Sequence, residues 1–317
     1  MLELFFCNVG DGDAILLREH RENEPDYTVL VDAGRPFVEP QNGSLRKEAI
    51  YFLKAAGVER IDRMYLSHLH IDHIGGAMRI LNEISVGRIE ALRFPPDGAK
   101  WLMPSFTSTD KPTNGLLHML NIFRDLCRTA AAKGTALVPV REGAERLTDR
   151  LTVEPILPKA TVIERQKRVF DALYRGEPVD EAEWFRVSKE RNVSSVMLRF
   201  TYAGRSILLS GDRYASDFED LPIEPCDIWK LPHHGDPKSV TEPLLEKLSP
   251  RIAVISCQSD AAAKKDRPNA GAIALLQSSA EFVLCTENKP LPTMRASTHN
   301  GVLVTIDEQG QITCSVV

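Results

Sequence analysis

The stretch Ser67-His68-Leu69-His70-Ile71-Asp72-His73-Ile74-Gly75-Gly76 places three histidines and one aspartate within six positions. It follows the mainly apolar run 63–66, and its glycine pair opens an amphipathic stretch. This order predicts a strand end, a tight loop and a helix start. Imidazole and carboxylate groups are the ligands that zinc prefers, with manganese and iron as alternatives at mixed sites.

The spacing of these side chains predicts a site for two metal ions. Alternate residues at a strand end point the same way, so His68 and His70 are expected to share one ion. Because the backbone turns after His70, Asp72 and His73 are expected to reach a second ion. Two ions about 4 Å apart polarise a substrate oxygen and hold a hydroxide for attack. The alternative is a polar surface loop, which the position between a strand and a glycine pair disfavours.

The composition indicates a globular protein with a substantial core, since 43% of the 317 residues are apolar and 26% are charged. The net charge of -5 argues against a surface built as a whole for nucleic acid, although a local basic groove is not excluded. Six scattered cysteines without a Cys-x-x-Cys pair favour buried, reduced thiols. No signal-peptide pattern and no apolar run of about 18 residues occurs, so a cytoplasmic protein without a membrane partner is expected.

The hydrophobic pattern alternates between strands and helices, which predicts an α/β arrangement with helices covering sheets. Residues 1–317 are expected to form one domain, with a variable, partly helical insertion at 95–191. Strands are expected at 2–7, 14–18, 27–31, 61–66, 88–94, 136–140, 151–156, 195–202, 206–209, 226–231, 252–256, 282–285, 301–306 and 311–316. Helices are expected at 45–56, 77–84, 116–133, 241–248 and 270–278.

Several motifs together resemble those of the metallo-β-lactamase-fold hydrolases, and more narrowly the branch that includes the soluble domain of the DNA-uptake channel protein ComEC. The motifs are the quoted loop, Asn8-Val9-Gly10-Asp11-Gly12-Asp13, Gly211-Asp212 and Pro232-His233-His234-Gly235. The resemblance runs from about 2 to 305, is weak at 95–192, and implies a four-layer αββα sandwich. The branch reads Asp-Val-Gly-Gln-Gly-Asp in the first motif, so Asn8 and Asp11 depart from it.

The resemblance also implies the remaining metal ligands. Asp212 would bridge both ions, and His234 would bind metal, with the reverse order of His233 and His234 left open. Many relatives have a third histidine before the Gly-Asp turn, but this chain has Arg191-Asn192-Val193-Ser194-Ser195 there. Asn192 is therefore a candidate weak oxygen ligand or a residue that supplies only a hydrogen bond, and the first ion is expected to bind loosely or to be manganese. Asp13 and Asp32 are expected to support the loop, with direct ligation by Asp32 as the alternative.

Further residues are weaker candidates for contact with substrate. Asp72 would orient the nucleophile, and His233, Ser239 or His299 would assist the leaving group. Ser256, Arg267 and Asn269 fall where the branch carries polar residues near the cleft. A basic cluster in the charged segment 159–191 is the first candidate for an anionic substrate, although a solvated helix face explains it as well; it contains Arg165, Lys167, Arg168 and Arg175.

The function expected is metal-dependent hydrolysis through a hydroxide activated by two divalent ions, on an anionic phosphodiester and with nucleic acid as one possible substrate. A carboxylic ester, lactone or thioester is the alternative substrate, with Trp101, Phe106 and Trp184 as an apolar wall. A binding module with a depleted metal site is the non-enzymatic alternative. Fold resemblance fixes the metal chemistry better than the substrate.

Overall fold

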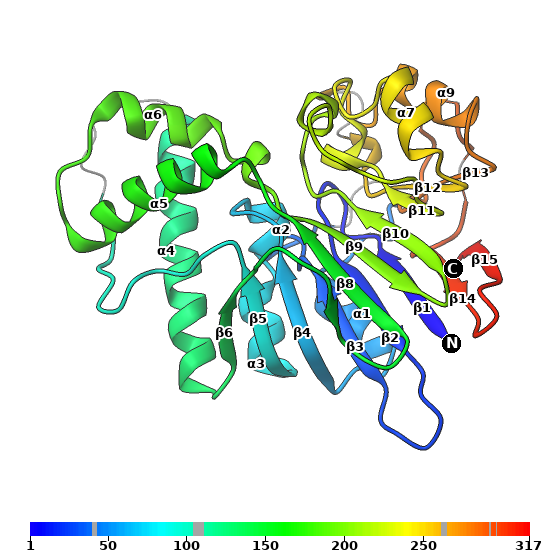
Figure 1. The fold of residues 1–317 in the computed structure, drawn as a ribbon, viewed down its shortest axis with the longest axis horizontal. Coiled ribbons are helices and arrows are strands. Elements are labelled where there is room, and N and C mark those ends of the chain that lie inside the picture. Colours follow the sequence, from blue (N-terminus) through cyan, green and yellow to red (C-terminus); the bar gives the residue numbers. More distant parts are fainter. Residues whose placement is uncertain (40–42, 104–110, 261–264, 292, 296) are drawn as a thin grey trace.

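The computed structural model describes residues 1–39, 43–103, 111–260, 265–291, 293–295 and 297–317. Two β-sheets pack face to face, and helices cover their outer faces (Figure 1). This arrangement confirms the four-layer αββα sandwich.

The first sheet has the strand order β15-β14-β1-β2-β3-β4-β5-β6. Neighbours from β15 to β3 are antiparallel, and those from β3 to β6 are parallel. Its strands are β1 Leu2–Cys7, β2 Ile15–Glu19, β3 Tyr27–Val31, β4 Arg60–Leu66, β5 Ser85–Ala91, β6 Ala136–Pro139, β14 Gly301–Ile306 and β15 Ile312–Val316.

The second sheet has the order β13-β12-β11-β10-β9-β8-β7, parallel from β13 to β10 and antiparallel beyond it. Its strands are β7 Glu145–Arg146, β8 Leu151–Ile156, β9 Met197–Tyr202, β10 Arg205–Leu209, β11 Ile228–Lys230, β12 Ile252–Ile255 and β13 Phe282–Cys285. The α-helices are α1 Ala49–Ala55, α2 Ile71–Ile74, α3 Ala77–Glu83, α4 Lys111–Ala132, α5 Ala160–Arg175, α6 Glu181–Lys189, α7 Glu242–Leu248 and α9 Ala270–Gln277.

Alternation along the strands explains why the sandwich forms. In β10, Ile207 and Leu209 enter the core between the sheets, whereas Leu208 packs under the helices on the outer face. Val29 and Val31 of β3 enter the same central core, and Leu30 packs with α1 and α3. A strand with apolar residues on both faces is expected only where both faces are covered.

The strand ends that matter for function meet at one edge. Strands β3 and β4 run parallel, as do β10, β11 and β12, so the loops that follow them leave from the same side of their sheets. The turn between β1 and β2 reaches this edge as well, because the backbone N–H of Asp13 donates to the carbonyl of Asp72 at 3.1 Å. The four motifs that carry the resemblance lie in these loops.

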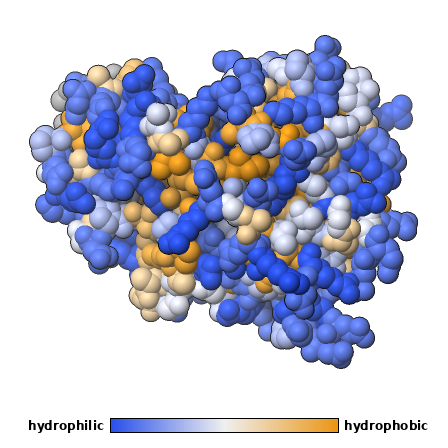
Figure 2. Space-filling model, in the orientation of Figure 1, coloured by the Kyte–Doolittle hydropathy of each residue, from blue (hydrophilic) through white to orange (hydrophobic). Residues whose placement is uncertain are grey.

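The segment 95–191 contributes to the sandwich and to a helical lobe. Strands β6, β7 and β8 belong to the two sheets, while α4, α5 and α6 pack on one another around a core of their own. Its description as an insertion therefore applies at most to the helices and stays a prediction. Residues 104–110 lie outside the described residues. Apolar surface gathers in the valley between this lobe and the side of α7 and α9 (Figure 2).

None of the helices in the described ranges is long and apolar enough to cross a membrane. All six cysteines are free thiols, and five of them are buried. This agrees with the reduced state expected from their scattered positions.

Candidate metal centre

The metal-ligand candidates come from four loops that glycines bring close together. Gly12 passes so near the histidine loop that a Cβ on it would lie 2.5 Å from the carbonyl oxygen of Asp72. Gly211 has φ +56°, and a Cβ there would meet that of Ser195 at 2.9 Å. These positions accept only glycine without a shift of the backbone, which is why Gly12 and Gly211 stand beside Asp13 and Asp212.

Among the residues that the structure describes, histidine and carboxylate donor atoms form three overlapping groups, in each of which all ligand atoms lie within 4.8 Å of one another. One group is His68, His70 and Asp212, and another is Asp72, His73 and His234. The third joins Asp13 and His73 to Asp212. The carboxylate of Asp212 is central, with its oxygens 3.8 Å from His68 Nε2, 3.3 Å from His73 Nε2 and 3.7 Å from His234 Nε2.

The three most buried histidine rings are held so that Nε2 faces this centre. His68 Nδ1 lies 3.1 Å from Ser67 Oγ, His73 Nδ1 lies 2.7 Å from Asp32 Oδ2, and His234 Nδ1 lies 3.1 Å from the carbonyl of Ser256. A partner on one ring nitrogen fixes the tautomer and orients the other nitrogen toward a metal ion.

Unpartnered buried atoms test whether a metal ion fits. Within the described part of the chain, His73 Nε2, Asp212 Oδ1 and His234 Nε2 are buried and have no hydrogen-bond partner. Polar groups buried in this way are rare in native proteins and call for an unseen partner. Nitrogen and oxygen atoms that converge on one point fit a divalent cation, so the residues present suit the metal ions expected from the sequence.

The electrostatics of the metal-free chain agree with such a centre. Burial, reinforced by His73 and His70, holds the pKa of His68 well below its usual value, and burial together with Arg191 lowers the pKa of His70 to about 3. Burial would raise the pKa of Asp212, but His73 and His234 outweigh it and hold that pKa well below its ordinary value. His68, His70 and Asp212 are thus in the neutral and ionised forms that bind metal. Burial would lower the pKa of His73, but Asp212 and Asp32 outweigh it and hold that pKa well above its usual value, so a metal ion would have to displace a proton from His73.

Asp32 supports the histidine loop through hydrogen bonds. Its carboxylate accepts the backbone N–H of Ser67 at 2.8 Å and the hydroxyl of Ser67 at 2.7 Å, besides facing His73. Asp32 lies outside all three donor groups. Its contacts therefore favour the supporting role over direct ligation.

A buried ion pair lies beside the centre. Lys230, at the end of β11, is 0% exposed, and its ammonium contacts the carboxylate of Asp13 and lies 3.4 Å from the carbonyl of Gly211. The other oxygen of Asp13 lies 3.7 Å from His234 Nδ1. Lys230 thus neutralises a carboxylate that borders the metal ligands.

His233 and His234 occupy left-handed backbone conformations, with φ +48° and +56°. Two such residues in succession are strained unless the surroundings impose them, and strain of this kind concentrates at functional sites. Only His234 enters a donor group. The geometry therefore favours His234 as the ligand.

His233 instead faces two polar side chains next to the centre. Its Nε2 lies 3.2 Å from Asn192 Nδ2, which in turn lies 3.0 Å from the hydroxyl of Tyr214. Asn192 thus directs its amide nitrogen at His233, which favours the hydrogen-bonding role over ligation of a metal ion. Burial lowers the pKa of His233 to about 4.

Three of the weaker site candidates hold other parts of the structure. Ser239 is fully buried and donates to the carbonyl of Pro232 at 2.8 Å, so it supports the His233–His234 turn. Asn269 caps α9 by accepting from the N–H of Ala272 at 3.0 Å. His299 is buried, with Nε2 3.0 Å from the carbonyl of Cys285. These contacts do not support a substrate-facing role for Ser239, Asn269 or His299.

Two of the four basic residues in the cluster on α5 pair with glutamates. Arg165 pairs with Glu190 at 2.6 Å and Arg168 pairs with Glu183, while Lys167 is exposed. The structure thus favours the solvated helix face.

Of the residues expected to form an apolar wall, the two in the described ranges occupy different places. Trp184 is 1% exposed and belongs to the core of the helical lobe. Trp101 lines a separate cavity of about 520 Å³. Phe106 lies outside the described residues.

Several charged residues beside the centre were not singled out from the sequence. Arg35 Nη2 lies 3.4 Å from Asp72 Oδ2, and Lys265 Nζ lies 2.6 Å from Asp11 Oδ2. Arg191 borders His70, whose pKa it lowers. The one signal for this group was Asp11, which stands where the resembled branch has glutamine.

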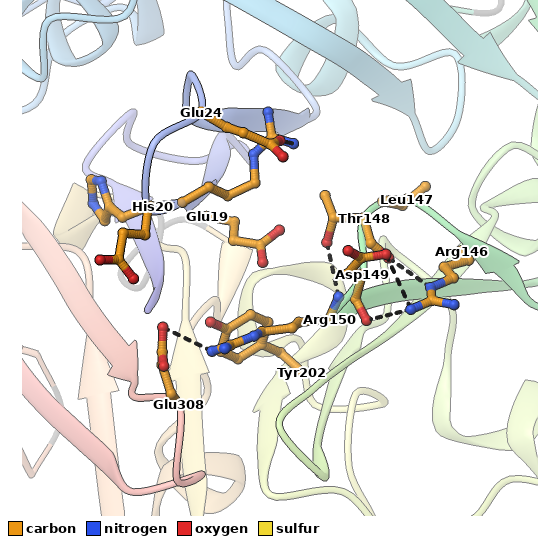
Figure 3. A pocket seen from close by; sticks show the side chains of 12 residues that line it. Glu19, His20, Glu24, Arg146, Leu147, Thr148, Asp149, Arg150, Tyr202 and Glu308 are labelled. Atoms are coloured by element: carbon orange, nitrogen blue, oxygen red, sulfur yellow. Dashed lines mark hydrogen bonds and ion pairs between the residues drawn. The ribbon is translucent and has the colours of Figure 1, made fainter.

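A separate cavity of about 590 Å³ opens between the β2–β3 and β7–β8 turns (Figure 3). Its arginines pair with neighbouring acids, Arg146 with Asp149 at 3.2 Å and Arg150 with Glu308 at 2.8 Å. The strand register places it at the far edge of the sandwich, because Leu151 pairs with Tyr202 while Ile156 pairs with Met197 near the centre. It contains no member of the metal-ligand groups.

The fold, the histidine loop and the bridging carboxylate together define the class of protein. Residues 7–259 match the family described as the Metallo-beta-lactamase superfamily, and the chain belongs to that superfamily. The match supports a metal-dependent hydrolase as the class of enzyme.

Within this class, the chain is 26% identical over 302 residues to ComE operon protein 3 of Bacillus subtilis (strain 168). The aligned region covers 90% of this chain but 32% of that relative, so the chain spans about a third of its length. This confirms the narrower resemblance.

Solved structures of the same fold include the protein YhfI of Bacillus subtilis, at 9% identity and TM-score 0.47, covering 96% of this chain and 99% of that one. Zn(2+)-bound PqqB of Methylobacterium extorquens has 9% identity and TM-score 0.46, covering 94% and 99%. Likenesses of this size indicate neither the substrate nor the metal of this chain.

Proposed function

We propose that this protein is a metal-dependent phosphodiester hydrolase with two divalent ions, zinc first and manganese or iron as alternatives. His68, His70 and Asp212 would hold one ion, Asp72, His73 and His234 the other, and Asp212 would be common to both. The observation that carries the proposal is the set of buried, unpartnered atoms His73 Nε2, Asp212 Oδ1 and His234 Nε2. The protein is expected to act in the cytoplasm.

Two bound ions would lower the pKa of water and stabilise negative charge on the attacked phosphate. Asp72 is ionised, because His73, His70 and His234 outweigh the burial that would raise its pKa. Its carboxylate can therefore accept a hydrogen bond from the attacking water and orient it. His233 has a pKa of about 4 in the metal-free chain because of burial, so its neutral ring suits orientation of the substrate better than protonation of a leaving group.

A carboxylic ester, lactone or thioester is the second candidate. The apolar surface in the valley of Figure 2 favours it. Against it stand the positions of Trp184, inside the lobe core, and Trp101, in a separate cavity. A depleted binding module is disfavoured because all six predicted ligands are retained and come together in the first two donor groups.

Metal content and hydrolysis of bis(p-nitrophenyl) phosphate test the proposal together. The wild-type protein should carry about two ions per chain and turn over this substrate, and His68→Ala and Asp212→Asn should each lower kcat at least about 100-fold. His118→Ala, an exposed histidine on α4, is the matched control and should change neither quantity.

Two results would redirect the proposal. Full metal content with hydrolysis of p-nitrophenyl acetate but not of the phosphodiester would favour the ester alternative. No bound metal after reloading would favour the binding module.

A further inference from the structure

Three cations from distant parts of the chain converge on one buried carboxylate beside the metal centre. Asp11 is 2% exposed, and its Oδ2 lies 2.6 Å from Lys265 Nζ, 3.8 Å from Arg267 Nη2 and 3.9 Å from Arg35 Nη2. The backbone N–H of Asp11 donates to Gln258 Oε1 at 3.1 Å, which ties the first turn to the segment leading to Lys265. One carboxylate thus orders three positive side chains.

The same cations border the proposed metal ligands. Arg35 Nη2 reaches Asp72 Oδ2 at 3.4 Å, and Arg267 is among the charges that lower the pKa of His233. A fourth cation, Arg191, lowers the pKa of His70. Burial lowers the pKa of Arg191 itself, and the nearby carboxylate of Asp72 partly offsets that effect. We call Arg35, Arg191, Lys265 and Arg267 the cationic rim, since it extends from His70 to His233.

Four carboxylates lie next to the four cations of this rim. They are Asp11, Asp72, Asp236 and Asp266; Arg35 Nη2 lies 3.4 Å from Asp72 Oδ2, Asp236 lies 3.6 Å from His233 Nδ1, and Asp266 accepts a hydrogen bond from Asn269. The charges of this region are therefore balanced, in a chain whose net charge is -5. Because a local field steers and binds ligands whatever the net charge, the overall acidity does not exclude an anionic substrate.

The cations of the rim are more exposed to solvent than Asp11, the carboxylate around which three of them gather. The side chains of Lys265, Arg35 and Arg267 are 46%, 33% and 14% exposed, whereas that of Asp11 is 2% exposed. Guanidinium groups present a planar fork of donors that matches phosphate oxygens. Side chains ordered in advance lose less conformational entropy when an anion binds.

We propose that the cationic rim binds phosphates adjacent to the scissile group, so that the substrate is a phosphodiester chain with more than one phosphate. This inference rests on the proposed hydrolase function and specifies its substrate class. Each phosphate neutralised by a rim cation releases a counterion, which makes binding strongly dependent on salt. A substrate with one phosphodiester occupies the metal centre without using the full rim.

The test compares a thymidine tetranucleotide with bis(p-nitrophenyl) phosphate. In Lys265→Gln/Arg267→Gln, kcat/KM on the tetranucleotide should fall about 10-fold to 100-fold, mainly through KM, and the fall on bis(p-nitrophenyl) phosphate should be several-fold smaller. The salt dependence of log KM for the tetranucleotide should weaken by a slope of up to about two. Metal content is measured for every variant.

Two further variants separate charge from structure. Arg146→Gln/Arg150→Gln removes two exposed cations at the far edge of the sandwich and should leave both substrates unaffected. Lys265→Arg/Arg267→Lys retains both charges and should restore most of the tetranucleotide activity.

The outcomes distinguish the two proposals. An equal fall on both substrates, or the same loss in the charge-retaining variant, would overturn the rim as a phosphate site while the hydrolase proposal stood. An unchanged tetranucleotide KM in Lys265→Gln/Arg267→Gln would do the same. Failure of the metal-loaded wild type to hydrolyse bis(p-nitrophenyl) phosphate would overturn the underlying function instead.

Discussion

Among the individual residues, His233 and His234 differ in environment although they are neighbours in sequence. His234 is fully buried, with Nδ1 held by the carbonyl of Ser256 and Nε2 directed toward Asp212. His233 lies at the edge of the centre, against Asn192 and Tyr214. The backbone turn that separates them therefore gives two identical side chains different tasks.

Substitution of each histidine should reveal this division. His234→Ala should lower the affinity for the second ion about 10-fold or more, because a donor nitrogen is lost. His233→Ala should retain metal content and lower kcat/KM about 10-fold to 100-fold. Metal titration followed by elemental analysis measures the first effect, and loss of metal from the His233 variant alone would reverse the assignment.

Lys230 and Asp13 form a second unit at this scale. Lys230→Met should destabilise the metal-free protein by about 3–5 kcal/mol, since removal of one partner leaves a buried charge uncompensated. Lys230→Met/Asp13→Leu removes both charges and should recover most of that loss. Urea unfolding of the two single variants and the double variant, in the presence of chelator, gives the coupling energy, and simple additivity would contradict the pairing.

Among the secondary-structure elements, the strands were the most predictable part of the chain. Strands β1, β3, β8, β13 and β14 have the bounds expected from the sequence, and β4 begins one residue earlier than expected. Alternating apolar residues carry this information locally. Helix α1 was predicted to begin at 45 but begins at Ala49, because Leu45 and Arg46 are held by contacts with the distant residues Asn288 and Asp260.

The ionic contacts of Glu3 on β1 with Arg18 and His20 predict that the stability of the protein depends on pH. Burial would raise the pKa of Glu3, but hydrogen bonds from His20 and Arg18 outweigh it and lower that pKa. A lowered folded-state pKa contributes stability above the unfolded value of about 4.3, and that stability is lost as pH falls through the folded value. Glu3→Gln should therefore reduce stability near pH 7 by under about 1 kcal/mol, and the difference should vanish below about pH 4.

Thermal unfolding of both proteins between pH 3 and pH 7 measures this difference. Glu22 is an exposed glutamate between β2 and β3, and Glu22→Gln is the control. Its stability should change with pH as that of the wild type does. A gap that stayed constant across this range would show that packing, and not ionisation of Glu3, stabilises the pair.

In the whole molecule, the centre and its rim are assembled from opposite ends of the chain. The histidine loop could be identified from the sequence because its ligands lie within six positions. Of the rim, only Arg267 was a candidate from the sequence. Arg35 and Lys265 share no local pattern with it and meet it only around Asp11, and Arg191 borders His70. The α5 basic cluster was the more visible pattern, yet Arg165 and Arg168 are paired with glutamates.

Because the ligands come from both sheets, metal binding should stabilise the whole sandwich. His68 follows β4 of the first sheet, whereas Asp212 and His234 follow β10 and β11 of the second. Ions at a concentration about 100-fold above Kd would stabilise the folded state by about 2.7 kcal/mol, if they bind only that state. Chelation should consequently lower Tm by several degrees, and one equivalent of metal per site should restore it.

His118→Ala should respond to chelation as the wild type does, whereas Asp212→Asn should lose most of the response because the shared carboxylate is altered. A Tm that is unaffected by chelator in protein shown to have lost its metal would mean that the sheets are held without the ions. The core between the sheets, which takes residues from nearly every strand, would then suffice for folding, and the metal centre would serve chemistry alone.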